Sequence, residues 1–167
     1  MEIYFKNNKL KNLDLLFNFI IMNLQFDSRY GKIIQHKASG FNLDDVANEL
    51  SINKQNIVKA IILESKDLDP IVCVIRAVDR LNNRIIKKEY SKNYSFMSEE
   101  NLLKINLSPG AIPPFIGFEL KFKTYIDTNL SFDETYYGSG GSVYSACEFR
   151  ISNYIQLGAK LFKLSKD

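Results

Sequence analysis

The sequence has very few of the side chains on which most enzyme chemistry depends. Its 167 residues include one histidine, His36, and two cysteines, Cys73 and Cys147. Two cysteines without C-x-x-C spacing make no disulfide framework, which is typical of a reducing compartment. A zinc site would need carboxylates to complete it, and a hydrolase with a nucleophile–histidine pair would have to use His36. The composition therefore disfavours both enzyme classes, and we expect no metal and no cofactor.

The sequence also lacks an apolar run long enough to cross a membrane. The longest uncharged apolar stretch, residues 15–26, has twelve residues, whereas a spanning helix needs about 20. Asp14 precedes it and Gln25-Phe26-Asp27 is no small-residue cleavage site, which argues against a signal peptide. We expect a cytoplasmic protein with no membrane partner. The run instead predicts an amphipathic helix packed on the domain, because apolar residues recur every three or four positions: Leu13, Leu16, Phe17, Ile20 and Leu24.

A strong excess of one charge is missing too. Twenty-two basic and 19 acidic residues give a net charge of +3. That is too slight to indicate a polybasic nucleic-acid binder, although it permits a partner with phosphates. The apolar fraction of 46% and the charged fraction of 25% are those of an ordinary globular chain. We expect a single domain over residues 1–167, with residues 1–30 as a helical segment packed on it.

The expected helices and strands follow one another in an irregular order. Apolar residues at helical spacing predict a helix over residues 43–50, with Asn42 as its N-cap. Continuous apolar runs predict buried strands at residues 57–63 and 71–78. Strands spread throughout the chain favour an α+β fold with a mixed, curled sheet over a doubly wound fold. Further strands are expected at 32–36, 94–97, 121–127, 145–151 and 160–164, and further helices around 81–86, from Ser98 onward and at 152–157.

Three features could carry chemistry, and each has a structural alternative. Lys59 is the one charge in the apolar run 57–63. It either reaches water from a sheet edge or points into a cleft to hold a phosphate or an oxyanion. The segment 108–117 is either a tight connection or a rigid rim whose N–H groups face a substrate. The turn 138–142 is either a hairpin or a backbone nest for an anion. The polar neighbours of His36 suggest an exposed ring, and Cys73 is expected in the core.

The order of these features resembles one family. Over about residues 30–165 the chain is similar to the YbaK/prolyl-tRNA synthetase-associated domain family of free-standing aminoacyl-tRNA deacylases. The resemblance implies a mixed α+β fold with a curled, barrel-like sheet flanked by helices. It also implies hydrolysis of misacylated tRNA in trans, as with Cys-tRNA(Pro) and Ala-tRNA(Pro). It rests on His36, a helix, Ile57-Val58-Lys59-Ala60-Ile61-Ile62, Asp79-Arg80-Leu81, Ser98-Glu99-Glu100, Pro109-Gly110-Ala111-Ile112-Pro113-Pro114-Phe115, Asp127 and Ser139-Gly140-Gly141, in that order.

The resemblance also implies site residues. Lys59 matches the family's strand lysine, the segment from Gly110 to Pro114 its Gly-Gly-x-x-Pro loop, and the segment from Ser139 its Ser-Gly-Gly turn. Lys59 would hold the phosphate or ribose end of the terminal adenosine, while the backbone near Gly110 positions the ester carbonyl. An aminoacyl ester is already activated, so the shortage of nucleophiles is no objection. The implied catalytic residues are Lys59, Gly110 and Ser139, and the implied substrate-binding residues are His36, Ala111, Ile112, Pro113, Gly140 and Gly141.

Some positions depart from the family pattern. Ala60 replaces the threonine that usually follows the lysine, and Ala111 replaces the second glycine of the loop. Ala111 and Ile112 are expected to line the aminoacyl pocket, so these changes bear on the identity of the substrate more than on the reaction. The other departures are Ile34 in place of a polar aromatic residue, Asn106 in place of a glycine, and an inserted Ile116.

The leading hypothesis is a deacylase that removes a small aminoacyl group from a misacylated tRNA through a pocket that selects by size. The tRNA could be tRNA(Pro). Its partner is the acceptor end of aminoacyl-tRNA, and a synthetase is a further candidate. The alternative is a non-catalytic module that binds an acceptor end or a nucleotide. A third hypothesis is a small-molecule hydrolase or a sugar or nucleotide binder on the same fold. Lys87, Lys88 and Lys92 suit either tRNA phosphates or a solvated face.

Overall fold

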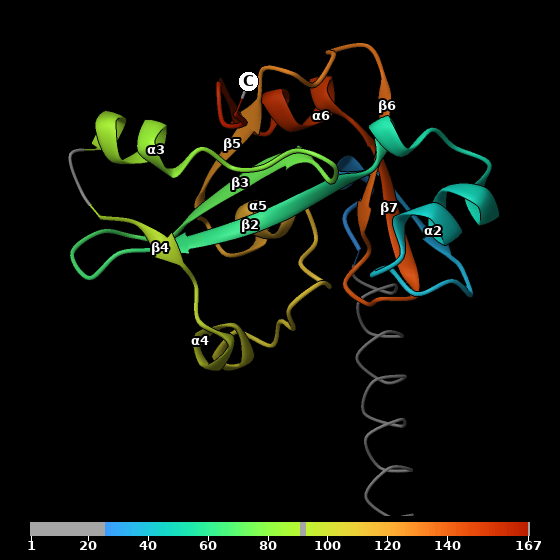
Figure 1. Ribbon diagram of the computed structural model, residues 1–167, viewed down its shortest axis with the longest axis horizontal. Coiled ribbons are helices and arrows are strands. Elements are labelled where there is room, and N and C mark those ends of the chain that lie inside the picture. Colours follow the sequence, from blue (N-terminus) through green and yellow to red (C-terminus); the bar gives the residue numbers. More distant parts are fainter. Residues whose placement is uncertain (1–25, 91–92, 167) are drawn as a thin grey trace, which may run out of the picture.

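The computed structural model describes residues 26–90 and 93–166, which form two β-sheets with helices packed around them (Figure 1). The helix expected at residues 13–24, and Lys92, lie outside the described residues. The strands are β1 (Lys32–Gln35), β2 (Val58–Glu64), β3 (Ile71–Arg76), β4 (Ser95–Phe96), β5 (Lys123–Asp127), β6 (Thr135–Ser139), β7 (Ser145–Arg150) and β8 (Lys160–Phe162). The helices are η1 (Ser28–Tyr30), α2 (Leu43–Leu50), η2 (Lys54–Asn56), α3 (Asn83–Tyr90), α4 (Glu99–Lys104), α5 (Ile116–Glu119) and α6 (Ile151–Gln156).

The larger sheet is mixed and the smaller one is antiparallel. The larger has the order β4-β2-β3-β5-β8, with β2 antiparallel to β3 and with β5 parallel to both β3 and β8. The smaller has the order β1-β7-β6. The predicted α+β class with a mixed sheet is confirmed. The strands divide between two sheets and, within the described residues, do not close a barrel. Within the same residues, no helix is long and apolar enough to cross a membrane.

The two apolar runs of the sequence become the centre of the larger sheet. Strand β3 is nearly all buried because it lies between β2 and β5 with both faces covered. Val72 and Val74 pack into one core, whereas Cys73 and Ile75 pack into another with Ile86 of α3. A strand buried on both faces has no reason to alternate polar and apolar residues. Cys73 is a core residue, as predicted, and burial raises the pKa of its thiol to about 12.

One edge of β2 is open along its first half. Strand β4 pairs only with Leu63 and Glu64, at the far end of β2. The first residues of β2 therefore meet the smaller sheet, where a parallel bridge joins Ile57 to Tyr137. Figure 1 shows this end of β2 reaching β6 and β7, with α2 beside them. The junction between the two sheets creates the cavity described below.

Several element boundaries differ from the sequence predictions: α3 begins at Asn83 rather than near residue 81, β3 ends at Arg76 rather than at residue 78, and β6 was not predicted as a strand. Asn42 caps α2, its side chain accepting the N–H groups of Asp44 and Asp45, as predicted. The expected turn at residues 138–142 is wrong at its start, because Gly138 and Ser139 are still paired to β7 as the end of β6. The proline and glycine segment 108–117 is also shorter than expected, since α5 begins at Ile116.

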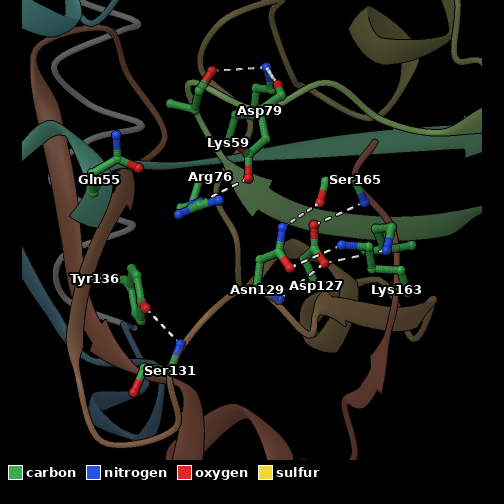
Figure 2. A network of polar contacts seen from close by, with 12 residues as sticks. Gln55, Lys59, Arg76, Asp79, Asp127, Asn129, Ser131, Tyr136, Lys163 and Ser165 are labelled. Carbon is green, nitrogen blue, oxygen red and sulfur yellow. Dashed lines mark hydrogen bonds and ion pairs between the residues drawn. The ribbon is translucent and has the colours of Figure 1, made fainter. Parts of the chain in front are cut away.

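A buried carboxylate joins β5 to the C-terminal segment. Asp127 is fully buried, and its carboxylate accepts the N–H groups of Leu164 (3.4 Å), Ser165 (2.9 Å) and Asn129 (3.2 Å). The Asn129 amide donates to the Ser165 hydroxyl (2.8 Å), and Lys163 donates to the Asn129 side-chain oxygen (Figure 2). These bonds hold the chain after β8 against the end of β5.

We expect Asp127→Ala to lower the free energy of unfolding by about 3 kcal/mol, because it leaves buried backbone N–H groups without an acceptor. Asp127→Asn keeps one acceptor oxygen and should cost less. Urea denaturation of the three proteins measures both losses. Equal stability of Asp127→Ala and the unmodified protein would contradict the anchoring role.

Candidate functional site

A cavity of about 270 Å³ lies at the junction of the two sheets. Its walls come from β2, from β6 and β7, from α2 and from the loop around Gly110. Five of the nine residues implied by the resemblance line it: His36, Lys59, Gly110, Ile112 and Ser139. The other four, Ala111, Pro113, Gly140 and Gly141, do not line it. The remaining lining residues are Gly40, Phe41, Leu43, Val46, Ile57, Val58, Ala60, Ala77, Tyr137, Gly138, Ser142, Ser145 and Ala146.

Lys59 is held by backbone carbonyls at the edge of the cavity. Its ammonium donates to the carbonyl oxygens of Ala77 (2.9 Å) and Asp79 (2.6 Å), in the turn after β3. Figure 2 shows Lys59 and Arg76 both directed toward Asp79, whose carboxylate binds Arg76 (2.8 Å). Burial lowers the pKa of Lys59, the charge of Asp79 raises it and the charge of Arg80 lowers it. Lys59 is therefore a fixed lysine at the cavity rather than one that reaches out into water.

An ammonium has three N–H donors, and the two carbonyls use two of them. Within the described residues, no acceptor is found for the third. Among the described residues that line the cavity, Lys59 is the only lysine or arginine.

The loop around Gly110 brings free backbone donors to the cavity. Gly110 has a left-handed φ of +78°, and the N–H of Ala111 donates to the Ser108 carbonyl (3.0 Å). Within the described part of the chain, the N–H groups of Gly110 and Ile112 have no recorded acceptor. Two such donors beside a cavity are the usual means of stabilising an oxyanion. The resemblance implies that Ala111 lines the pocket, but Ala111 is only 5% exposed and does not line the cavity.

Close packing holds this loop against β6. Pro114 lies so near Gly138 that a Cβ on Gly138 would be 2.7 Å from the Pro114 ring. The ring of Phe41 covers Gly110 and is itself 70% exposed, at the mouth of the cavity. The Gly/Pro loop and the strand that ends in Ser139 are thereby brought side by side, although nearly thirty residues separate them in sequence.

The glycine turn after β6 is closed on itself. Gly140 donates to the Ser145 carbonyl, Gly141 to the Ser139 hydroxyl and Ser142 to the Ser145 hydroxyl. The backbone nest considered from the sequence is therefore not formed, because these N–H groups already have acceptors. What the turn presents to the cavity instead is hydroxyl groups, those of Ser139, Ser142 and Ser145.

His36 is buried, contrary to the prediction from its polar neighbours. Its side chain is 8% exposed and lines the cavity. The polar neighbours Gln35 and Lys37 do not indicate exposure of His36, because successive side chains of an extended chain point to opposite sides. The Nδ1–H group of His36 donates to the Ala38 carbonyl (2.7 Å), and the His36 N–H donates to the Tyr144 carbonyl (3.0 Å).

Several lining residues were not singled out from the sequence. Ser145 is 2% exposed and is bonded to Ser142 (3.0 Å between the hydroxyl oxygens). Its position three residues beyond Ser142, at the start of β7, was the only available signal. The sequence gave no signal for Phe41, since an aromatic residue just before a helix is common in any fold.

None of the described residues that line the cavity carries a carboxylate. Within the described residues there is also no cluster of three or more histidine, cysteine or acidic side chains that could hold a metal ion. The site therefore offers one ammonium, one imidazole, hydroxyl groups and backbone N–H donors around an apolar interior. Such a set can hold a small apolar group next to a polar carbonyl and a phosphate.

The chain is similar to known proteins in sequence pattern and in fold. A family model described as "Aminoacyl-tRNA editing domain" matches residues 38–157. The solved structure of "hypothetical protein APE2540" superposes with a TM-score of 0.72 at 20% identity, covering 81% of this chain and 91% of that one. A structure described as "a putative trans-editing enzyme for prolyl tRNA synthetase" gives a TM-score of 0.73 at 17% identity, covering 81% and 87%. No curated protein matches the chain in sequence.

Proposed function

Because the chain belongs to the aminoacyl-tRNA editing domain family, we propose that it hydrolyses the ester bond of misacylated tRNA. It would act in trans, on a small aminoacyl group, and tRNA(Pro) is the first tRNA to test. One observation carries the proposal: the cavity joins the lysine of β2 to two free backbone N–H groups in the loop after α4. A cation and paired donors around one small space suit an ester next to a phosphate.

The chemistry follows from these groups. A water adds its oxygen to the ester carbonyl carbon, and the carbonyl oxygen becomes negative as it does so. The N–H groups of Gly110 and Ile112 donate to that oxygen and stabilise the developing charge. The ester C–O bond then breaks, the ribose oxygen leaves with a proton from water, and the free amino acid departs. The third N–H of Lys59 binds the phosphate or ribose end of the terminal adenosine and fixes the ester.

The exposed ring at the mouth suits the terminal base. Phe41 is 70% exposed and lies over Gly110, next to where the ester would sit. Aromatic side chains bind unpaired bases by stacking on them.

The same cavity would serve a non-catalytic acceptor-end binder, and turnover separates the two functions. Release of amino acid from Ala-, Cys-, Ser-, Thr- and Pro-charged tRNA, above the spontaneous rate, tests the proposal.

The apolar interior sets the size of the aminoacyl group. The apolar side chains that line the cavity include Val46, Val58, Ala60, Ala77 and Ile112. A cavity of about 270 Å³ must also hold the ester and the amine, which leaves room for only a short side chain. A steric sieve of this kind separates substrates by about 10- to 200-fold for each methylene.

We expect Ile112→Ala to widen the substrate range. It should raise kcat/KM for valyl-tRNA relative to alanyl-tRNA by about 10-fold or more. Ile155→Ala is the matched control, since Ile155 packs against the same core outside the cavity. The ratio of the two kcat/KM values checks this, and a ratio that stays constant in Ile112→Ala would show that Ile112 does not limit side-chain size.

A further inference from the structure

His36 lines the cavity, and only one of its two ring nitrogens has a partner among the described residues. A carbonyl oxygen can only accept a hydrogen bond, so the 2.7 Å contact with the Ala38 carbonyl requires a proton on Nδ1. In the neutral ring the other nitrogen, Nε2, then has a lone pair and no proton. Within the described residues no donor to Nε2 is recorded. The ring is nonetheless buried and lines the cavity.

A carboxylate is bonded to the backbone that follows His36. The two carboxylate oxygens of Glu49, in α2, accept the N–H groups of Lys37 and Ala38, each at 2.7 Å. These two hydrogen bonds lower the pKa of Glu49, and they outweigh the effect of desolvation, which raises it. Glu49 therefore stays ionised next to the segment that anchors His36.

The cavity is consequently polarised between its two walls. His36, with Glu49 bonded to the backbone that follows it, belongs to the wall of the smaller sheet, and Lys59 belongs to the wall of the larger one. Lys37 and Tyr137 are the other titratable groups around His36 and the lining. An aminoacyl ester has the same polarity, with an α-ammonium at one end and a phosphate-bearing ribose at the other. The Lys59 wall suits the ribose end, which leaves the ammonium opposite His36.

We propose that Nε2 of His36 accepts an N–H of the substrate's α-ammonium, so that the site takes esters with a free amine and rejects N-acylated ones. The proposal rests on the proposed function, because it assumes that an aminoacyl group occupies the cavity. Acylation removes the positive charge and two of the three donors, and it adds bulk. The described part of the lining has no carboxylate that could replace His36 as the acceptor. Peptidyl-tRNA and N-acetylaminoacyl-tRNA are therefore excluded as a class.

Two substitutions separate the acceptor from the structural role of the ring. His36→Asn keeps a side-chain N–H near the position of Nδ1, for the Ala38 carbonyl, and lacks an acceptor at the position of Nε2. His36→Gln places its amide at the position of Nε2 and can accept there. A third variant, Glu49→Gln, removes the carboxylate charge near His36 and leaves the lining residues unchanged. It replaces His36→Asn in the test if that variant does not fold.

The test is binding of 3′-alanylamido-3′-deoxyadenosine and of its N-acetyl derivative, neither of which has an ester to hydrolyse. We expect the unmodified protein to bind the free amine at least about 10-fold more tightly, as for a charge-assisted hydrogen bond. The preference should fall below about 2-fold in His36→Asn, stay in His36→Gln and weaken in Glu49→Gln.

Equal affinity of the unmodified protein for both compounds, failure of both to bind, or a preference that survives in His36→Asn would overturn the inference. Amine-selective binding without deacylation of any charged tRNA would support the inference about His36. The same result would reject only the proposed hydrolysis. The two ideas therefore fail by different results.

Discussion

Replacing Lys59 by methionine is expected to lower the single-turnover rate of deacylation by about 100-fold or more, the usual cost of losing a group that stabilises or orients the reacting ester. Methionine keeps an unbranched apolar stem along β2 and removes only the charge and its donors. The third N–H of the ammonium is then missing from the cavity, while Gly110 and Ile112 keep theirs. Single-turnover assays measure the chemical step apart from product release.

This loss should not come from unfolding. Burial lowers the pKa of Lys59, which means that its charged form is less stable in the folded protein than in water. Methionine removes this cost together with the bonds to Ala77 and Asp79. We expect the two effects to offset each other within about 1 kcal/mol.

Lys54→Met is the control for a general loss of positive charge. Lys54 lies in η2, just before β2, pairs with Asp44 and does not line the cavity. Its substitution should leave the single-turnover rate unchanged. Full activity in Lys59→Met, or an equal loss of activity in both variants, would show that the Lys59 ammonium has no specific role in deacylation.

Gly31→Ala is expected to cost about 3 kcal/mol or more and to abolish activity together with the fold. Gly31 has a φ of +127° and precedes β1. A Cβ there would overlap the carbonyl oxygen of Glu148 in β7 and lie 3.1 Å from the Cβ of Phe149. The Glu148 backbone cannot move away without breaking the pairing of β1 with β7, which begins at Lys32. Because His36 follows β1, the cavity loses one wall.

Gly158→Ala separates steric overlap from backbone strain. Gly158 also has a positive φ, +102°, but a Cβ there would meet nothing within 4 Å. We expect only the conformational cost, about 1 kcal/mol. Chemical denaturation of both variants gives the comparison, and equal losses would show that the contact with Glu148 is not the cause.

Local sequence patterns predict the parts of this molecule that depend on neighbours in the chain. The apolar run around Lys59, the cap at Asn42 and the proline and glycine loop were all recognisable because their residues act within a few positions of one another. Their order along the chain carried the resemblance to the YbaK/prolyl-tRNA synthetase-associated family, which the match to the editing-domain model confirms.

The parts that depend on distant pairing were not predictable. His36 is buried because β1 pairs with β7, more than 100 residues later, and no local pattern encodes that pairing. The same pairing divides the strands into two sheets. Gly140 and Gly141 looked like a phosphate nest because glycines favour one. Their N–H groups instead donate to Ser139 and Ser145, whereas within the described residues no acceptor is found for the N–H groups of Gly110 and Ile112.

The central claim is that this cavity releases amino acids from tRNA rather than only binding the acceptor end. Multiple-turnover release of radiolabelled alanine or cysteine from charged tRNA(Pro), in parallel with binding of uncharged tRNA(Pro), tests it most directly. We predict release well above the spontaneous rate with the unmodified protein, and release near the spontaneous rate with Lys59→Met. Tight tRNA binding with no release by the unmodified protein, for these and for the other small-residue tRNAs, would contradict it.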